Sequence, residues 1–359
     1  MTRPIFERFP KIAGRIPFIE LINAPTPVAH EPSLGREIGY DELYVKRDDQ
    51  SAADYGGNKP RKLEFLLARA KTEGAKSVVT IGGIGTNHGL ATAIFARKLG
   101  LSCHLVLFDQ PVTHYVRKNL LLFHRFGAVC HYAGGYAKTA WIVAREMVRS
   151  RFTPGGGTFL VPPGGSSALG CLGFIDAALE LERQVQSGVL PCPSYIFCAV
   201  GSCGTYAGLL AGLKLTALPT RVIGVRVVDK IVVNAASILK YANGALDLLR
   251  EAGEKIGDAR VAASDVTVLD DFFGGEYGRV TPEGQAAVDL ASRHGLKLET
   301  TYTGKAFAGM ASFLSDRSAR LGPAVFWNTY NSVDLNAEMA KISPLDLDPV
   351  FRRFLGEAR

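Results

Sequence analysis

Short apolar segments rich in β-branched residues alternate with longer helix-like segments along most of this chain. Such alternation forms parallel sheets with right-handed crossovers, because each helix packs back onto the sheet before the next strand begins. The sequence therefore predicts an α/β fold in which helices cover both faces of open, twisted sheets. Residues 1–40, which contain several turn-forming prolines, are expected to form an arm ahead of the first strand.

The pattern also places the individual elements. Strands are expected at residues 42–46, 77–81, 102–108, 129–132, 158–161, 194–200, 221–227, 265–269, 297–299 and 324–327. Helices are expected at residues 61–74, 87–99, 114–126, 136–151, 168–187, directly after 205, near 231–252, and at 282–294 and 304–319.

Composition excludes several classes of protein. The net charge is +7, but Lys and Arg are scattered with no run longer than two, which favours attraction of small anions over nucleic-acid binding. The six cysteines form no Cys-x-x-Cys pair and the histidines show no metal-ligand spacing, so we expect no metal and a reducing, cytoplasmic location. Neither a secretory signal nor an apolar run of the ~18 residues needed to span a membrane is found.

A lysine between glycines and a proline is the first candidate for chemistry. Lys59 follows Gly56-Gly57-Asn58 and precedes Pro60, at the start of a predicted helix. Glycines allow a cofactor to approach the backbone closely, and the positive end of a helix dipole disfavours the charged form of a lysine. A neutral amine is the form that attacks a carbonyl group. By itself this stretch also fits a solvated lysine at a helix start.

Two glycine-rich turns lie between a strand and a helix, where anions bind. Gly201-Ser202-Cys203-Gly204-Thr205 combines backbone N–H groups with two hydroxyls and suits a monoester phosphate, although a plain turn explains it equally well. It lacks the Walker and dinucleotide-binding patterns. The turn 82–88 ends in Thr86-Asn87-His88 and suits a carboxylate or a ring hydroxyl, while His88 alone more often has a structural role.

These features together indicate one kind of site. A lysine, a phosphate-type turn and a carboxylate-type turn describe pyridoxal 5′-phosphate (PLP) joined to the lysine, with an amino-acid substrate held by its carboxylate. Tyr302-Thr303 and Thr329 follow two further strands, at the sheet edge where α/β proteins bind ligands.

The chain resembles the family of 1-aminocyclopropane-1-carboxylate (ACC) deaminases and D-cysteine desulfhydrases, which are fold-type II PLP enzymes. The resemblance covers roughly residues 5–330, with matching segments in family order. These segments are FERFPKI, INAPTPV, VKRDDQ, GGNKPRKLEFLLA, IGGIGTNH, VPPGGSSALGCLGFIDAALEL, GSCGTYAGLLAGL, EYGRVTPEG and YTGKAFAGM.

The resemblance implies specific roles for cofactor-binding residues. Lys59 is the Schiff-base lysine and the acid/base at the substrate α-carbon, and Asn87 bonds the cofactor ring hydroxyl. Thr303 faces the pyridine nitrogen, with Thr329 nearby. The phosphate is held by Gly201, Ser202, Cys203, Gly204 and Thr205, with help from Lys62.

The resemblance also implies the substrate-facing residues. Thr86 takes the place of a serine that handles the substrate, and the turn containing Asn87 and His88 holds the substrate carboxylate. Tyr277 and Tyr302 flank the ring and the substrate, and Thr86 and both tyrosines are the expected catalytic partners of the lysine.

Two positions separate the activities within this family. ACC deaminases carry Glu and Leu where this chain has Thr303 and Thr329, whereas desulfhydrases carry small hydroxyl residues at both. A carboxylate favours a protonated pyridinium, which is a strong electron sink, while a neutral hydroxyl suffices when thiolate is the leaving group. The resemblance therefore implies β-elimination from D-cysteine or a related β-substituted D-amino acid, giving pyruvate, ammonia and sulfide.

Departures from the family pattern keep other activities open. Gly85 replaces a glutamine and is expected to open space, Thr86 adds a methyl group, and Tyr330 and Asn331 add bulk. The alternatives are a specialised PLP enzyme acting on a larger amino acid by elimination, β- or γ-replacement or epimerisation, an ACC deaminase, and a carrier that has lost catalysis. A nucleotide-binding protein is the weakest alternative.

The expected architecture has two domains. Residues 1–61 and 171–359 form the large PLP-binding domain, residues 62–170 form a small inserted α/β domain, and the cofactor lies in the cleft between them. The resemblance also implies that the enzyme is a homodimer. It implies in addition that the enzyme acts on a small amino-acid substrate and has no nucleic-acid or membrane partner.

Overall fold

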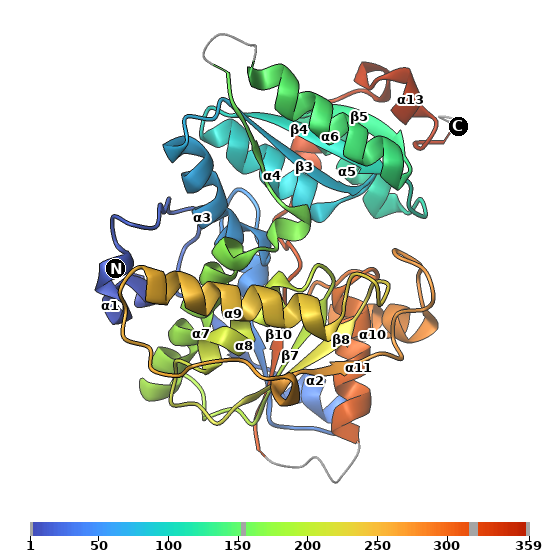
Figure 1. Cartoon of the computed structure of the whole chain (residues 1–359). Coiled ribbons are helices and arrows are strands. Elements are labelled where there is room, and N and C mark those ends of the chain that lie inside the picture. The colour runs from blue at the N-terminus through green and yellow to red at the C-terminus, as the bar shows by residue number, and fades with distance from the viewer. Residues whose placement is uncertain (1–2, 152–155, 316–321, 357–359) are drawn as a thin grey trace. The chain divides into compact units, whose positions relative to one another are not determined.

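The computed structural model describes residues 3–151, 156–315 and 322–356, and its contacts divide the chain into two compact units (Figure 1). Unit 1 comprises Met1–Ile16, Ile22–Lys62 and Ser166–Ser332. Unit 2 comprises Pro17–Leu21, Leu63–Gly165 and Val333–Arg359.

Unit 1 is built on a six-stranded sheet with the order β1-β2-β10-β7-β8-β9. Strand β1 at one edge pairs antiparallel with β2, and the remaining neighbours are parallel. The strands are β1 (Val28–His30), β2 (Leu43–Lys46), β7 (Tyr195–Val200), β8 (Arg221–Arg226), β9 (Thr267–Leu269) and β10 (Ala324–Trp327).

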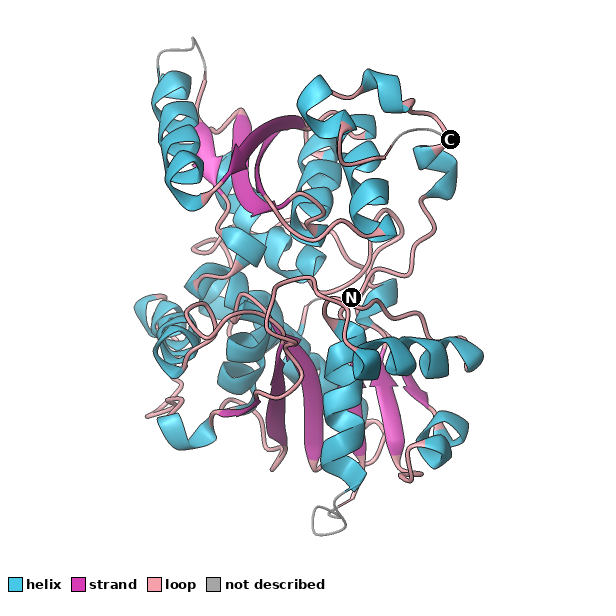
Figure 2. Cartoon of the chain, turned by 90° about the vertical axis from the view of Figure 1, so that its right-hand side faces the viewer, coloured by secondary structure: helices cyan, strands magenta, loops and turns pink. Residues whose placement is uncertain are grey.

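Helices cover both faces of this sheet (Figures 1 and 2). Helices α7, α8 and α9 pack on one another along one face, while α10 and α11 pair and α11 contacts β7 and β8 on the other. The helices of unit 1 are α1 (Pro4–Arg8), α2 (Pro32–Glu37), α7 (Ala168–Gln186), α8 (Gly204–Leu213), α9 (Ala235–Glu251), α10 (Pro282–Arg293) and α11 (Thr303–Ser315). Helix α3 (Lys59–Thr72) begins in unit 1 and continues into unit 2.

Unit 2 is built on a four-stranded parallel sheet with the order β5-β4-β3-β6. Helices α4 and α5 pack together on one face, and α6 crosses the other face in contact with all four strands (Figure 1). The elements are β3 (Ser77–Gly83), α4 (Asn87–Lys98), β4 (Ser102–Phe108), α5 (His114–Arg125), β5 (Val129–Gly134), α6 (Tyr136–Arg151), β6 (Thr158–Leu160), α12 (Asn336–Met339) and α13 (Pro349–Arg352). Short 3-10 helices lie at Pro10–Ile12, Asp48–Gln50, Pro163–Gly165, Ala263–Asp265 and Pro344–Asp346.

The predicted α/β class is confirmed, and three local predictions were wrong. The N-terminal arm contains α1, α2 and edge strand β1, and the region near 231–252, where more than one helix was expected, holds the single helix α9. No strand forms at residues 297–299. The reason is that Glu299 is occupied in starting α11: its N–H donates to Thr303 Oγ1 at 2.9 Å and its carbonyl accepts from Gly304 at 2.8 Å.

The units differ from the expected domains at Lys62 and residues 166–170, which lie in unit 1, and at two longer segments. Pro17–Leu21 belongs to unit 2, since the N–H of Ile19 donates to the carbonyl of Glu64 at 3.0 Å. The C-terminal segment Val333–Arg359 also belongs to unit 2, because α12 packs on α5 and Glu338 pairs with Arg125 at 2.7 Å. Both contacts join residues far apart in the chain, which sequence patterns do not reveal.

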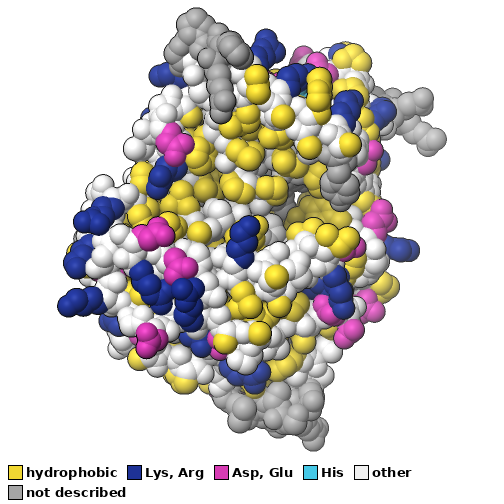
Figure 3. Space-filling view, viewed as in Figure 1, with side chains coloured by type: hydrophobic (Ala, Val, Ile, Leu, Met, Phe, Trp, Pro, Cys, Tyr) yellow, Lys and Arg dark blue, Asp and Glu magenta, His cyan; other side chains and the backbone are white. Residues whose placement is uncertain are grey.

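Surface features agree with the scattered charge of the sequence. On the face in Figure 3, basic and acidic side chains intermingle, and hydrophobic side chains gather over the part of the molecule that contains α6. Trp141 and Val148 of α6 are among the exposed large hydrophobic residues. Within the described ranges, every helix is too short or too polar to cross a bilayer.

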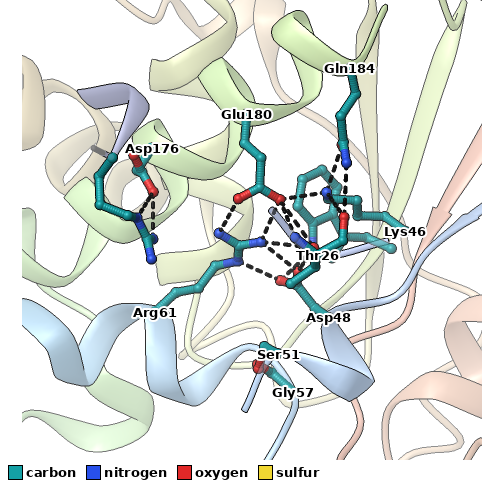
Figure 4. A network of polar contacts seen from close by, with 11 residues as sticks. Thr26, Lys46, Asp48, Ser51, Gly57, Arg61, Asp176, Glu180 and Gln184 are labelled. Atoms are coloured by element: carbon teal, nitrogen blue, oxygen red, sulfur yellow. Dashed lines mark hydrogen bonds and ion pairs between the residues drawn. The ribbon is translucent and has the colours of Figure 1, made fainter. Parts of the chain in front are cut away.

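A network of buried charges lies at the start of α3 (Figure 4). The guanidinium of Arg61, fully buried, donates to both carboxylate oxygens of Asp48 at 2.8 and 2.9 Å and to both of Glu180 at 3.0 and 3.1 Å. Lys46 also pairs with Glu180 and donates to the carbonyl of Thr26 at 2.7 Å. Two cations therefore face two anions, and the pKa of Glu180 falls well below its usual range through Arg61 and Lys46, despite burial.

Replacing Arg61 by Leu should destabilise the protein strongly. The change leaves two buried carboxylates facing one lysine, and breaking a buried ion pair in this way costs about 3–5 kcal/mol. Chemical denaturation of the two proteins measures the difference. The matched control is Arg183→Leu, which removes an exposed pair with Glu7 and should leave the midpoint nearly unchanged. Equal effects of the two substitutions would contradict a special role for the network.

Candidate active site

The backbone ahead of Lys59 is held on both sides. The N–H of Gly57 donates to the carbonyl of Asp48 at 2.7 Å, and Ser51 Oγ donates to the carbonyl of Gly57 at 2.9 Å (Figure 4). Gly57 has a φ of +89°, and a Cβ there would lie 2.7 Å from the carbonyl oxygen of Thr329. Only glycine fits this close approach, so the sequence dictates how the chain enters α3.

The Lys59 amine lies in a site that favours its neutral form. Its Nζ donates to Asn58 Oδ1 at 2.7 Å and lies 5.8 Å from the centroid of the Tyr302 ring. Burial, together with the positive charge of Lys62, lowers the pKa of Lys59 to about 7, although Glu299 opposes the shift. A substantial fraction of this amine is therefore unprotonated near neutral pH.

The predicted phosphate turn precedes α8. Ser166 Oγ donates to Ser202 Oγ at 2.8 Å and accepts the N–H of Gly204 at 3.0 Å, while Asn58 Nδ2 donates to Thr205 Oγ1 at 2.8 Å. Cys203 has a φ of +68°, a left-handed conformation that is strained for a non-glycine residue and that clusters at ligand sites. The turn thus presents hydroxyls and the positive end of a ten-residue helix toward one place.

Lys62 lies beside this turn. Its side chain is buried, with Nζ 5.9 Å from the Phe174 ring centroid, and the thiols of Cys171, Cys203 and Cys198 are close enough to act on its charge. Burial lowers the pKa of Lys62 to about 8. A bound dianionic phosphate would favour the ammonium form, which agrees with the predicted role of Lys62.

A tyrosine pair and a capped helix start complete this part of the site. The hydroxyls of Tyr277 and Tyr302 are 2.5 Å apart, and burial raises the pKa of Tyr277 to about 12, so this phenol stays protonated at neutral pH. The Glu299 carboxylate accepts the N–H groups of Tyr302 and Thr303 at 2.7 and 3.0 Å. Thr303 is 1% exposed and accepts the Glu299 N–H through its hydroxyl.

The second predicted turn starts α4 in unit 2. Thr86 Oγ1 caps this helix by accepting the N–H of Gly89 at 3.2 Å, and Asn87 Oδ1 accepts from Asn119 Nδ2 at 3.0 Å. His88 is buried, and its Nε2 lies 3.1 Å from Thr80 Oγ1 on β3. This contact favours a structural role for His88 over the predicted contact with the substrate.

The prediction that Gly85 opens space was wrong. A Cβ at Gly85 would lie 2.6 Å from Val116 Cγ2 of α5, so Val116 occupies the space that a side chain would need. The side chain of Asn331 makes a structural hydrogen bond, because its Oδ1 accepts the N–H of Gly56 at 2.7 Å. Both departures from the family pattern brace the backbone of a turn.

Sequence reasoning missed several residues of the site. Asn58 links the lysine amine to Thr205, Ser166 bridges the phosphate turn, and Glu299 supplies the nearest negative charge to the tyrosines and Lys59. The signal for Asn58 was its place beside Lys59, and Ser166 lies in a glycine-rich loop of its own. Nothing in the spacing of the histidines indicated that His104 and His131 meet Glu146 in unit 2.

These residues fit a PLP site, and comparison with known proteins identifies the family to which the chain belongs. The model of the pyridoxal-phosphate-dependent enzyme family matches residues 19–328. The chain belongs to this family. Its predicted cofactor is thereby confirmed. Lys59 and the turn 201–205, which were predicted to hold the aldehyde carbon and the phosphate, both lie in unit 1.

The relatives narrow the family further. D-cysteine desulfhydrases from Klebsiella pneumoniae (strain 342) and Salmonella paratyphi B are each 35% identical over 325 residues, covering 88% of this chain and 94% of the relative. The solved structure of an ACC deaminase homologue is 30% identical, with a TM-score of 0.77 over 95% of this chain and 99% of the other. This family member is accordingly a PLP-dependent lyase of the ACC deaminase and D-cysteine desulfhydrase group.

More distant structures share the fold alone. The processed form of threonine deaminase isoform 2 from Solanum lycopersicum is 18% identical, with a TM-score of 0.59 over 95% of this chain and 88% of that one.

The pKa of Lys59 predicts how cofactor loading depends on pH. Only the neutral amine attacks the aldehyde of PLP, so the rate of incorporation into the apoenzyme should rise with pH and reach half its maximum near pH 7. Visible absorbance and borohydride trapping measure this rate. Lys59→Arg should give no trapped product, and a midpoint near the ordinary lysine value of about 10.4 would contradict the buried, neutral amine.

The close contact between Gly85 and Val116 predicts a coupled pair. Gly85→Ala should destabilise the fold by about 1–3 kcal/mol through overpacking, and less in a Val116→Ala background. Thermal or chemical denaturation of the four proteins yields the coupling energy. The control is Gly135→Ala, where the added Cβ meets no heavy atom within 4 Å. Additive effects at Gly85 and Val116 would show that the turn relaxes freely.

Proposed function

We propose that this enzyme catalyses β-elimination from D-cysteine or a related β-substituted D-amino acid, giving pyruvate, ammonia and, from D-cysteine, sulfide. The observation that carries the proposal is the pair of hydroxyl residues, Thr303 and Thr329, at the positions where desulfhydrases and deaminases differ. Similarity to proteins named D-cysteine desulfhydrase over 88% of the chain supports it.

The residues of the chain divide the work between binding and proton transfer. Bound PLP supplies an aldehyde that takes up the substrate amine and a ring that accepts electron density from the α-carbon. The turn 201–205 with Lys62 binds the phosphate, and Thr86 and Asn87 bind the substrate carboxylate and the ring hydroxyl. Lys59 Nζ, a substantial fraction of which is unprotonated near neutral pH, removes the proton from the substrate α-carbon.

The tyrosine pair is placed at the later step, in which the β-substituent leaves. Tyr277 and Tyr302 share a short hydrogen bond and stay protonated at neutral pH, because burial raises both pKa values. We propose that one of them assists departure of the β-substituent as a proton donor. Loss of the α-proton and the thiolate yields an enamine, whose hydrolysis gives pyruvate and ammonia.

The surroundings of Thr303 suit a substrate with a good leaving group. The Thr303 hydroxyl is neutral and accepts the N–H of Glu299. The Glu299 carboxylate accepts N–H groups at the start of α11. A carboxylate that would enforce a charged pyridine ring is thus replaced here by a neutral group. Thiolate leaves readily without that assistance, whereas cleavage of a cyclopropane ring needs it.

Two observations favour a small substrate over the larger amino acids considered from sequence. Val116 fills the space beside Gly85, and the side chain of Asn331 holds the N–H of Gly56. We propose in addition that the enzyme is cytoplasmic, as its cysteine usage indicates, and that it is a homodimer, as the resemblance implies. Light scattering coupled to size-exclusion chromatography tests the dimer.

The reaction is tested with the purified holoenzyme. We expect D-cysteine to yield sulfide and pyruvate in equal amounts, with L-cysteine and ACC giving far less product. Lys59→Ala supplies the background, and it should abolish turnover because the α-proton then has no acceptor. Turnover of D-cysteine no faster than that background would exclude this substrate, and preferential release of 2-oxobutyrate from ACC would favour the deaminase alternative.

A further inference from the structure

A cluster of two histidines and a glutamate lies in unit 2, outside the residues assigned to PLP. His104 is on β4, His131 on β5 and Glu146 on α6. In the parallel register of the two strands, His131 pairs with Val106, two residues beyond His104, so both rings project from the same face of the sheet. That is the face that α6 covers, which brings Glu146 to the two rings.

The ligand atoms of the cluster converge. His104 Nδ1 lies 3.1 Å from His131 Nε2 and 3.7 Å from Glu146 Oε2, and the three ligand atoms all lie within 4.8 Å of one another. The imidazole planes are nearly parallel, at 7° with centroids 5.4 Å apart. Since the two nitrogens face each other at hydrogen-bond distance, at least one of them presents a lone pair to the other.

These separations match those around a small divalent ion. Zinc binds nitrogen and oxygen ligands at about 2.0–2.2 Å in a tetrahedral arrangement, which places neighbouring ligand atoms about 3.3 Å apart. The observed nitrogen–nitrogen and nitrogen–oxygen separations lie on either side of this value. Two imidazoles and one carboxylate are also a ligand set that zinc proteins use, with the fourth position open.

We propose that His104 Nδ1, His131 Nε2 and the carboxylate of Glu146 form a binding site for a divalent transition-metal ion of the zinc class, with water completing its coordination. The site joins two neighbouring strands to the helix that covers them. Bound metal would thus clamp α6 to the sheet of unit 2.

The second shell of the cluster is already in place. Arg145 donates from Nε and Nη2 to Glu146 Oε1 at 2.9 and 2.7 Å, which leaves Oε2 directed at His104. Carboxylate ligands of metals are commonly oriented by such hydrogen bonds. Glu146 is 6% exposed, so its geometry is held by protein rather than by solvent.

One hydrogen bond must change when the metal binds. Arg145 Nη2 lies 3.3 Å from His131 Nδ1, and because arginine only donates, Nδ1 accepts and Nε2 carries the proton that points at His104. Metal binding moves this proton to Nδ1 and requires Nη2 to withdraw. The side chain of Arg145 is 40% exposed and can do so while its Nε keeps Glu146.

The ligand types make the site selective. Imidazole nitrogens suit Zn²⁺, whereas Mg²⁺ prefers oxygen ligands and retains its water. We therefore expect binding of Zn²⁺ and no binding of Mg²⁺.

The experiment uses the full-length holoenzyme, freed of metal by EDTA and dialysed. Calorimetric titration with ZnCl₂ should show one ion bound per chain at this site, and CoCl₂ should produce the intense visible absorption of four-coordinate cobalt. His104→Gln and His131→Gln should each weaken Zn²⁺ binding at least about 100-fold and remove the cobalt spectrum, because loss of a direct ligand exceeds the 10–100-fold cost of losing an outer-shell partner.

The controls separate this site from adventitious binding. His294→Gln removes a histidine that pairs with Glu37 outside the cluster and should bind Zn²⁺ as the unmodified enzyme does. Melting temperatures show whether each variant folds, and Zn²⁺ should raise that of the unmodified enzyme but not those of the two cluster variants. Unchanged Zn²⁺ affinity in His104→Gln and His131→Gln, or no binding by the unmodified enzyme at millimolar Zn²⁺, would overturn the proposal.

Discussion

The buried guanidinium of Arg61 is the contact on which the catalytic end of unit 1 depends. Arg61 lies two residues after Lys59 on the first turn of α3, and its guanidinium makes five hydrogen bonds to Asp48, Glu180 and Thr26. Asp48 in turn receives the N–H of Gly57 through its carbonyl and the indole N–H of Trp327 through its carboxylate. The orientation of α3 is thereby fixed to β10 and α7.

The two basic residues at this helix start show opposite solutions to burial. Arg61 keeps its charge because two carboxylates offset the loss of hydration, and its pKa is raised. Lys59 has an amide oxygen as its hydrogen-bond partner, and burial and a second lysine close by lower its pKa. A rigid ion network beside a readily neutralised amine is what covalent chemistry with an aldehyde requires, because the amine must be both unprotonated and held in place.

The turns of the site are shaped by close contacts between glycines and neighbouring residues. Gly57 approaches Thr329, Gly204 approaches Ser166, and Gly85 approaches Val116, in each case too closely for a Cβ. Residues that depart from the family pattern take part in these contacts. Asn331, which from sequence was expected to change the substrate-facing surface, instead anchors Gly56. Variation beside an active site can therefore preserve the backbone rather than redirect specificity.

The sequence alone was sufficient for the α/β class and for most strands and helices. Periodicity and glycine placement are local properties, and they survive without knowledge of tertiary contacts. The family motifs also carried PLP and the lyase class. The failure at residues 297–299 shows the limit, since Glu299 reads as part of a strand until its contacts with α11 are known.

Only the tertiary structure decided which residues far apart in the chain contact one another. The pairing of Arg61 with Glu180, the filling of the space beside Gly85, and the association of α12 with unit 2 each join residues tens to hundreds of positions apart. The same holds for His104, His131 and Glu146, whose linear spacing matches no metal motif. Burial and charge compensation depend on which side chains meet in space, and a one-dimensional pattern does not encode that meeting.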